Sequence, residues 1–121
     1  ESYVEVVKEV PVGCKTEKCQ ILSYIVEKFG DDAANAITML RKCENSNFDQ
    51  SATNVNKNGT TDSGIFQVNS VHAKRYGNAF MYDWKANIDV AYEIYKSAGY
   101  KFTPWSCSYT IGQTNYYGRS K

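Results

Sequence analysis

The sequence lacks a long apolar run, a basic cluster and a set of metal ligands, and each absence argues against a class of function. No apolar stretch approaches the roughly 20 residues of a membrane-spanning helix, so we expect no membrane contact by this domain itself. The formal net charge is only +1 and no basic block exceeds two residues, which argues against nucleic acid as a partner. His72 is the only histidine, and we expect no metal site and no cofactor.

Four cysteines are available for a covalent role, and they allow three pairings. Zinc ligation is the competing use, but the spacing between Cys14 and Cys19 is loose for zinc and a single histidine adds little. We therefore expect two disulfides, Cys14–Cys19 and Cys43–Cys107. Because disulfides persist in oxidising compartments, the protein is expected to be extracytoplasmic.

Length and composition fit one domain preceded by a short extension. The chain has 121 residues, of which 42% are hydrophobic, enough for one compact core. Residues 1–12 form a charged, valine-rich stretch, either an edge strand or a tether, and we interpret them as a tether or linker from a longer parent protein. Because the N-terminal residues show no secretory signal pattern, we interpret the chain as a processed or excised domain. Residues 13–121 are its folded part, expected to be a monomer.

Apolar periodicity predicts two consecutive helices in the first part of this domain. The first covers residues 17–29, with Thr16 as its N-cap and Gly30 ending it in the left-handed conformation. The second begins with Asp31 as its cap and carries an apolar stripe that continues as far as Glu44. A carboxylate at the end of an apolar stripe is unusual, because burying a charge is costly.

The polar segment that follows predicts a small β-ribbon. Asn58-Gly59 is the pair that favours a type I′ hairpin turn, since both positions need positive φ. This turn places residues 54–56 opposite residues 60–62 in a two-stranded antiparallel ribbon. Such a ribbon is not stable alone and must pack against helices.

Two further helices are predicted after the ribbon. The apolar pattern over residues 64–72 is consistent with a short helix, and the pattern over residues 83–98 with a longer one that Gly99 ends. The fold class is therefore α+β, mostly helical with one small antiparallel β-ribbon.

Glu44 and Asp62 stand in contrasting sequence contexts. Glu44 ends an apolar helix, whereas Asp62 lies among hydroxyl-bearing residues of the ribbon. Glycoside hydrolysis uses such a contrast, because one carboxyl group must stay protonated to donate its proton while the other stays ionised. From the helix pattern alone, a glutamate at a frayed end in water is the stronger interpretation.

The segment from Glu44 to Ser70 resembles the catalytic stretch of the lysozyme superfamily. The family pattern Glu-Ser-Asn-Phe…Ala-Thr-Asn is similar to ENSNFDQSATN at residues 44–54. The pattern Asn-x-x-Gly-Ser-Thr-Asp-Tyr-Gly-Ile-x-Gln-Ile-Asn-Ser is similar to NKNGTTDSGIFQVNS at residues 56–70, and its Gly-[IL]-x-Gln part is shared with soluble lytic transglycosylases. Weaker similarity extends backwards over the preceding helix and forwards to residues 104–107. The resemblance implies a lysozyme-like catalytic domain over residues 13–121.

The resemblance implies specific roles for the two carboxylates. Glu44 corresponds to the general acid, and Asp62 to the second carboxylate, which acts as nucleophile or electrostatic stabiliser. Asn56, close to Asp62 on the ribbon, is expected to hydrogen-bond and orient that carboxylate.

Three further residues are expected at the substrate site on the same grounds. Gln67 and Asn69 correspond to residues that offer amide groups to sugar hydroxyl and N-acetyl groups. The alternative for both is a structural role that ties the ribbon to a helix. Trp105 corresponds to the late tryptophan that lines the sugar cleft opposite the glutamate, and plain core packing is its alternative.

The sequence also departs from the family pattern. Asn45 is an extra residue between the glutamate and the Ser-Asn-Phe that follows it. It is either absorbed in the turn leaving the helix, or it shifts Glu44 relative to Asp62. Ser63 replaces the usual tyrosine, and the four-disulfide framework of animal lysozymes is absent, which points to a bacterial or phage relative. The near-neutral charge suits an enzyme tethered beside its substrate.

Three functions remain open at this stage. The first is a glycosidase that cleaves the β-1,4 bond of peptidoglycan between N-acetylmuramic acid and N-acetylglucosamine, with both carboxylates active. The second is a lytic transglycosylase that uses Glu44 alone and gives 1,6-anhydro products. The third is a non-catalytic glycan-binding module on the same fold. In each case the partner is a peptidoglycan glycan strand, and the protein is secreted, tethered at a cell surface or associated with a phage.

Overall fold

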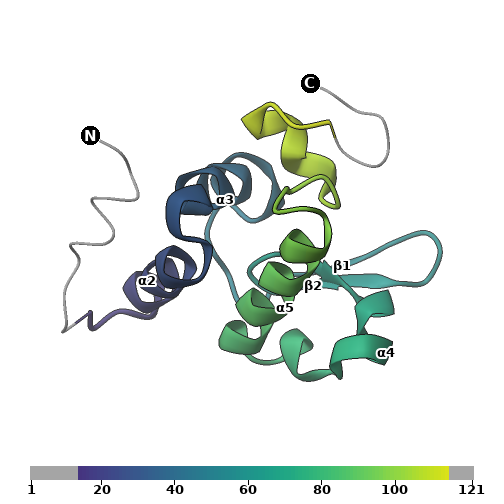
Figure 1. The fold of residues 1–121 in the computed structure, drawn as a ribbon. Helices are drawn as coiled ribbons and strands as arrows, with labels where there is room; N and C mark the ends of the chain where they lie inside the picture. The colour runs from purple at the N-terminus through teal and green to yellow at the C-terminus, as the bar shows by residue number, and fades with distance from the viewer. Residues whose placement is uncertain (1–13, 115–121) are drawn as a thin grey trace.

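The computed structural model describes residues 14–114, and these form a mostly helical α+β domain with a small antiparallel sheet. Helices α2 and α3 lie on one side of the central helix α5, and the sheet and α4 lie on the other (Figure 1). The elements in chain order are α2 Glu17–Phe29, η1 Gly30–Asp32, α3 Ala33–Met39, η2 Leu40–Glu44, β1 Thr53–Val55, β2 Thr61–Ser63, β3 Val68–Asn69, η3 Ser70–His72, α4 Ala73–Tyr76, η4 Ala79–Met81, α5 Trp84–Ser97 and η5 Ser106–Ile111. The tether predicted for residues 1–12 lies outside the described residues.

Helix α2 has the predicted bounds. The Thr16 side chain caps it by accepting a hydrogen bond from the Cys19 backbone N–H at 3.1 Å. Gly30 ends the helix with φ +55° and ψ −122°, so the predicted positive φ is confirmed, but the predicted left-handed helical conformation was wrong. Just before the helix, Cys14 is joined to Cys19 by the expected disulfide.

The second helix differs from the prediction at both ends. The chain passes through the 3₁₀ turn η1, and α3 starts only at Ala33, so Asp31 is not its cap. At the other end the helix widens into the π-helical turn η2, in which the Asn45 N–H bonds to the Leu40 carbonyl at 2.9 Å. The predicted apolar stripe of α3 is buried.

The sheet has three strands rather than the two expected. Strands β1 and β2 pair antiparallel with Asn54 opposite Asp62, the predicted register. The third strand, β3, pairs with β2. The short helix predicted over residues 64–72 was wrong, because a turn over residues 64–67, the two residues of β3 and the 3₁₀ turn η3 take its place. The apolar residues of the segment 64–72 are spaced as they would be in a helix. Positive φ at Gly64 (+77°) and Gln67 (+50°) nevertheless prevents a continuous helix.

The hairpin turn between β1 and β2 is also different from the predicted type I′ turn. Gly59 has φ +88°, but Asn58 does not have positive φ. The Gly59 N–H bonds to the Asn56 carbonyl at 3.0 Å, and the Asn56 N–H bonds to the Thr60 carbonyl at 2.8 Å. This is the three-residue loop that needs positive φ only at its last position, which explains why the register was right although the turn type was wrong.

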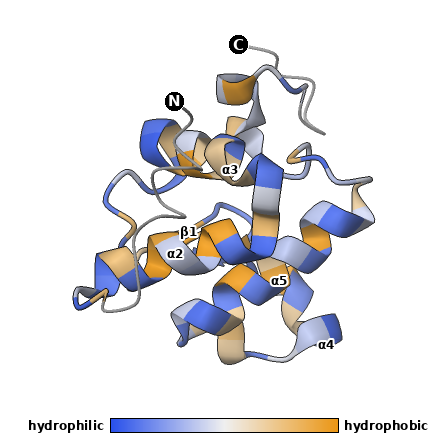
Figure 2. Ribbon diagram, turned by 60° about the vertical axis from the view of Figure 1, so that its left-hand side comes forward, coloured by the Kyte–Doolittle hydropathy of each residue, from blue (hydrophilic) through white to orange (hydrophobic). Residues whose placement is uncertain are grey.

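The apolar core lies where α2, α3 and α5 meet, and their apolar faces turn inward (Figure 2). Phe29 is its centre, because its ring contacts those of Phe66, Tyr92, Tyr95 and Phe102 at centroid distances of 5.0–5.5 Å. Helix α5 nearly matches the predicted range of residues 83–98. The expected second disulfide joins Cys43 to Cys107, so the end of η2 is fixed to η5.

Candidate active site

A cleft of about 790 Å³ lies between the sheet, η3 and α4, the C-terminal end of α5 and residues 104–106. Its lining contains both carboxylates singled out in the sequence. It also contains each of the predicted binding residues. The six are Glu44, Asn56, Asp62, Gln67, Asn69 and Trp105. The fold therefore brings every candidate site residue to one cavity, from segments up to 61 positions apart in the chain.

Glu44 is the last residue of η2 and is half-buried at the cleft. Burial raises the pKa of its carboxyl group from 4.5 to about 7, and the negative charge of Asp62 adds to this rise. One hydrogen bond acts in the opposite direction, because the Cys107 backbone N–H donates to Oε2 at 3.3 Å. A large fraction of Glu44 is therefore protonated near neutral pH, unlike a glutamate at a frayed helix end in water.

Asp62 is the central residue of β2 and lies in a polar setting. Its Oδ1 accepts a hydrogen bond from Asn69 at 2.9 Å, and its Oδ2 accepts one from Asn56 at 3.3 Å. Both amides also donate to the Thr60 hydroxyl at 3.1 Å. Asn56 thus lies where the sequence predicts it, and a pair of amides fixes the orientation of the carboxylate.

The extra residue Asn45 lies immediately after the π-helical turn. A π turn contains one more residue between hydrogen-bonded groups than an α turn does, and such turns are frequent at functional sites. The bond from the Asn45 N–H to the Leu40 carbonyl has this spacing. The extra residue is accordingly absorbed within the helix end, and Glu44 still reaches the cleft.

The Asn45 side chain is buried and connects the helix end to the sheet. Its amide nitrogen donates to the carbonyls of Asp49 at 2.9 Å, Gly64 at 3.2 Å and Ile65 at 3.4 Å. Its amide oxygen accepts from the Asp49 N–H at 3.0 Å. Since Asn45 follows Glu44 directly, this network positions the glutamate relative to the strand that carries Asp62.

Gln67 lines the cleft, but its amide is bound within the protein. The nitrogen donates to the carbonyls of Ala52 at 3.1 Å and Gly64 at 3.0 Å, and the oxygen accepts from Asn54 at 2.6 Å. Asn69 is engaged in the same way, because its oxygen accepts from the Val71 N–H at 3.0 Å. These contacts favour the structural interpretation of both residues over a direct contact with sugar.

Trp105 combines the two interpretations that the sequence left open. It is buried, its indole N–H donates to the Phe66 carbonyl at 2.8 Å, and its ring packs against Phe66 and Phe102. It also lines the same cleft as Glu44. A hydrogen-bonded, packed indole offers a rigid apolar surface to a sugar ring.

Sequence reasoning missed Asn87, which fixes the loop after β2 to α5. This fully buried side chain accepts from the Phe66 N–H at 2.8 Å and donates to the carbonyls of Ser63 at 2.8 Å and Phe80 at 2.9 Å. Gly64 must stay without a side chain, since a Cβ there would lie 2.4 Å from the Asn87 amide nitrogen. An asparagine beside the apolar stripe of a predicted helix was the available signal.

The wall formed by η3 and α4 was also missed. His72, Arg75 and Tyr76 line this side of the cleft, although the sequence assigned no role to His72. Among residues 14–114 no group of three or more possible metal ligands lies together. No helix in that range is long and apolar enough to cross a membrane.

One comparison with known proteins gives a match. The family described as a lysozyme-like domain matches residues 28–107, which is more than half of the chain and includes both carboxylates, the whole sheet and Trp105. No curated protein and no solved structure matches significantly. The matched range, the α+β architecture and the cleft agree, and the chain therefore belongs to the family of lysozyme-like domains, which act on peptidoglycan.

Proposed function

We propose that this protein is a glycosidase that cleaves the β-1,4 bond of peptidoglycan between N-acetylmuramic acid and N-acetylglucosamine. Glu44 is the general acid and Asp62 is the nucleophile or electrostatic stabiliser. The observation that carries the proposal is the contrast between two carboxyl groups that line one cleft. Burial raises the pKa of Glu44 to about 7, whereas two amides bind the Asp62 carboxylate.

The reaction follows from this contrast. Glu44 donates its proton to the glycosidic oxygen as the bond from that oxygen to the anomeric carbon breaks. Asp62 stabilises the positive charge that develops on the sugar, or bonds to the anomeric carbon. Water then attacks that carbon and gives its proton to Glu44, and any bond between the carbon and Asp62 breaks in the same step, so that both carboxyl groups return to their starting state.

The residues around the two carboxyl groups hold them in place and shape the cleft. Asn56 and Asn69 hold the Asp62 carboxylate toward the cleft, and Asn45 and the Cys43–Cys107 disulfide hold the helix end that carries Glu44. Trp105 supplies an apolar wall for a sugar ring. Small displacements of such groups are costly to a reaction that depends on near-attack geometry.

The test is mass spectrometry of the soluble products released from purified peptidoglycan by the wild type, Glu44→Gln and Asp62→Asn. We expect fragments with reducing ends from the wild type and a severe loss from both variants. Fragments with 1,6-anhydro ends, with activity retained in Asp62→Asn, would identify a lytic transglycosylase instead. Glycan binding without any product from the wild type would identify a binding module.

A further inference from the structure

Arg75 is the one cationic side chain of fixed charge among the residues lining the cleft. The other ionisable groups there are Glu44, Asp62, His72 and the phenol of Tyr76. Burial lowers the pKa of His72 below its ordinary value of 6.5, so this imidazole is mostly neutral near pH 7. Within residues 14–114, Arg75 is therefore the only fixed positive charge that lines the cleft.

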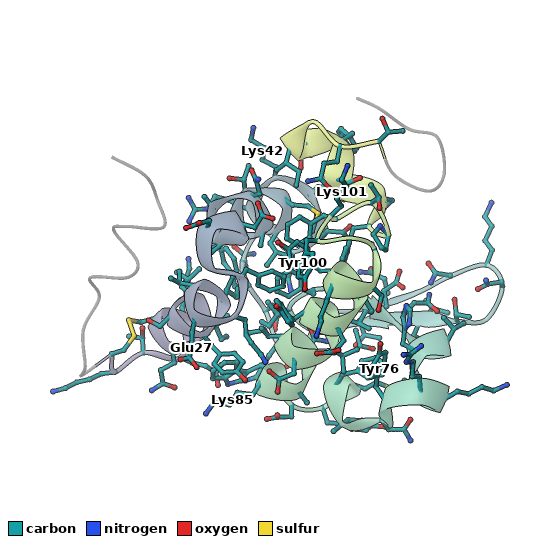
Figure 3. The ribbon with its side chains drawn as sticks, viewed as in Figure 1. Glu27, Lys42, Tyr76, Lys85, Tyr100 and Lys101 are labelled. Carbon is teal, nitrogen blue, oxygen red and sulfur yellow. A yellow bond between two sulfur atoms is a disulfide. The ribbon has the colours of Figure 1, made fainter. Side chains whose placement is uncertain are left out.

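The guanidinium of Arg75 has no acidic partner among the residues that the structure describes. No carboxylate of residues 14–114 forms an ion pair with it, and its recorded contact is with the Tyr76 ring at 5.6 Å from the centroid. Tyr76 extends from α4 toward α5 (Figure 3), and His72 lies beside it with ring centroids 6.5 Å apart. An exposed arginine is often only solvated, but Arg75 lines a cleft, and no carboxylate of residues 14–114 forms an ion pair with it.

Planar guanidinium groups match carboxylates particularly well, since two parallel N–H donors bind the two oxygens. If the substrate is peptidoglycan, as proposed above, its N-acetylglucosamine units carry no charge. Carboxylates occur on the muramic acid side, either on the lactyl group of an unsubstituted unit or on the stem peptide attached to a substituted one. A cation on one wall of the glycan cleft thus distinguishes peptidoglycan from an uncharged N-acetylglucosamine polymer.

We propose that Arg75 forms a carboxylate-binding subsite on the α4 wall, which selects peptidoglycan strands through an acidic group borne by muramic acid. This inference rests on the proposed function only for its ligand. The subsite acts through binding, so it is separable from the chemistry at Glu44. His72 and Tyr76 form the surface from which the guanidinium extends.

The test is isothermal titration calorimetry in the Glu44→Gln background, which prevents turnover of bound glycan. Three probes are compared: a hexamer of N-acetylglucosamine, glycan strands stripped of peptides by an amidase, and soluble strands that retain their peptides. We expect Arg75→Gln to weaken binding about ten-fold for at least one carboxylate-bearing probe, the effect of one charge-assisted hydrogen bond. The uncharged hexamer should change by less than about two-fold. Loss on stripped strands identifies the lactyl carboxylate, and loss confined to intact strands identifies the stem peptide.

Two variants control for other causes. Lys74→Gln removes the same charge from the neighbouring exposed position, which does not line the cleft, and it should leave all three affinities unchanged. Arg75→Lys keeps the charge without the planar fork and should restore part of the affinity. The proposal is overturned if Arg75→Gln weakens all three probes equally or none of them, or if Lys74→Gln has the same effect. Failure of the catalytic proposal is separate, since it is decided by the products and rates of the enzyme and not by the affinities of the Arg75 variants.

Discussion

The helical part and the sheet of this domain are stabilised in different ways. Helices α2, α3 and α5 meet through buried apolar side chains centred on Phe29. The three strands are short, and all of β1 is exposed. The sheet depends instead on amide side chains such as Asn54, Asn56 and Asn87, which bind other side chains and backbone carbonyls.

This difference between the two parts explains why the two carboxyl groups of the cleft have different environments. Glu44 extends from the apolar helical part, so the pKa of its carboxyl group is raised. Asp62 extends from the polar sheet, where amides surround it. The cleft between the two parts therefore combines a proton donor with a carboxylate held by hydrogen bonds, because each wall provides a different environment.

The largest expected effect comes from removing the proposed general acid, Glu44. Glu44→Gln should lower the rate of peptidoglycan cleavage by roughly 10²–10⁴-fold, the usual contribution of a positioned general acid. Glu27→Gln, at an exposed position of α2, is the matched control and should be neutral. Equal rates for wild type and Glu44→Gln would refute the assignment of the acid.

Glu44→Gln should also raise the free energy of unfolding, by an amount that increases with pH. The folded-state pKa of Glu44 is about 7, above its unfolded value of 4.5. Ionisation therefore costs nothing below about pH 4.5, costs more as pH rises, and reaches its full cost above about pH 7. Glu44→Gln should be more stable than the wild type above pH 7, by roughly 1–3 kcal/mol, in urea titrations at several pH values. A stability difference that does not change with pH would contradict this explanation.

The two parts should also differ in their sensitivity to apolar truncation. Phe29→Ala should lower the free energy of unfolding by about 3–5 kcal/mol, because its buried ring contacts four other rings. Val55→Ala on β1, where the side chain is 76% exposed, should cost less than about 0.5 kcal/mol. Chemical denaturation measures both, and similar losses would show that the sheet has an apolar dependence that its contacts do not explain.

The connection between the two parts can be tested at Asn45. Asn45→Ala removes four hydrogen bonds of its buried amide group and should cost about 1–3 kcal/mol of stability. Because Asn45 positions Glu44, the variant should also shift the alkaline limb of the pH–rate profile. Asn47→Ala, at an exposed position two residues later, should change neither quantity. An unaltered pH profile in Asn45→Ala would leave Asn45 with a structural role alone.

The smallest expected effect concerns the influence of one carboxylate on the other. The charge of Asp62 is the least of the three causes acting on Glu44, so Asp62→Asn should lower the pKa of Glu44 by less than about one unit. Titration of the Glu44 carboxyl carbon by NMR measures this without requiring activity. A pKa that falls to the ordinary value would mean that burial is not the main cause, and a pKa that rises would mean that Asp62 does not act through its negative charge.

The sequence predicted the features that depend on local signals, and it failed where distant parts of the chain decide the structure. The bounds of α2 were predicted because its apolar period, Thr16 and Gly30 are all local signals. The helix expected over residues 64–72 was wrong because Ile65, Phe66 and Val68 imitate a helical pattern. They are buried by contacts with distant parts of the chain instead. The roles of Asn45 and Asn87 were not predicted, since the sequence does not show which carbonyls, up to 24 positions away along the chain, these amides bind.

The sequence by itself determined the helices α2 and α5, the register of β1 with β2, the α+β class and the candidate residues of the cleft. These depend on apolar period, on capping and turn residues, and on the resemblance of residues 44–70 to one family. Only the tertiary structure decided that Glu44 is half-buried and that Asn45 is absorbed by a π turn. It also decided that Arg75 lines the same cleft with no acidic partner among residues 14–114. The physical reason is that burial, the pKa of a carboxyl group and the pairing of charges depend on which distant segments the fold brings together.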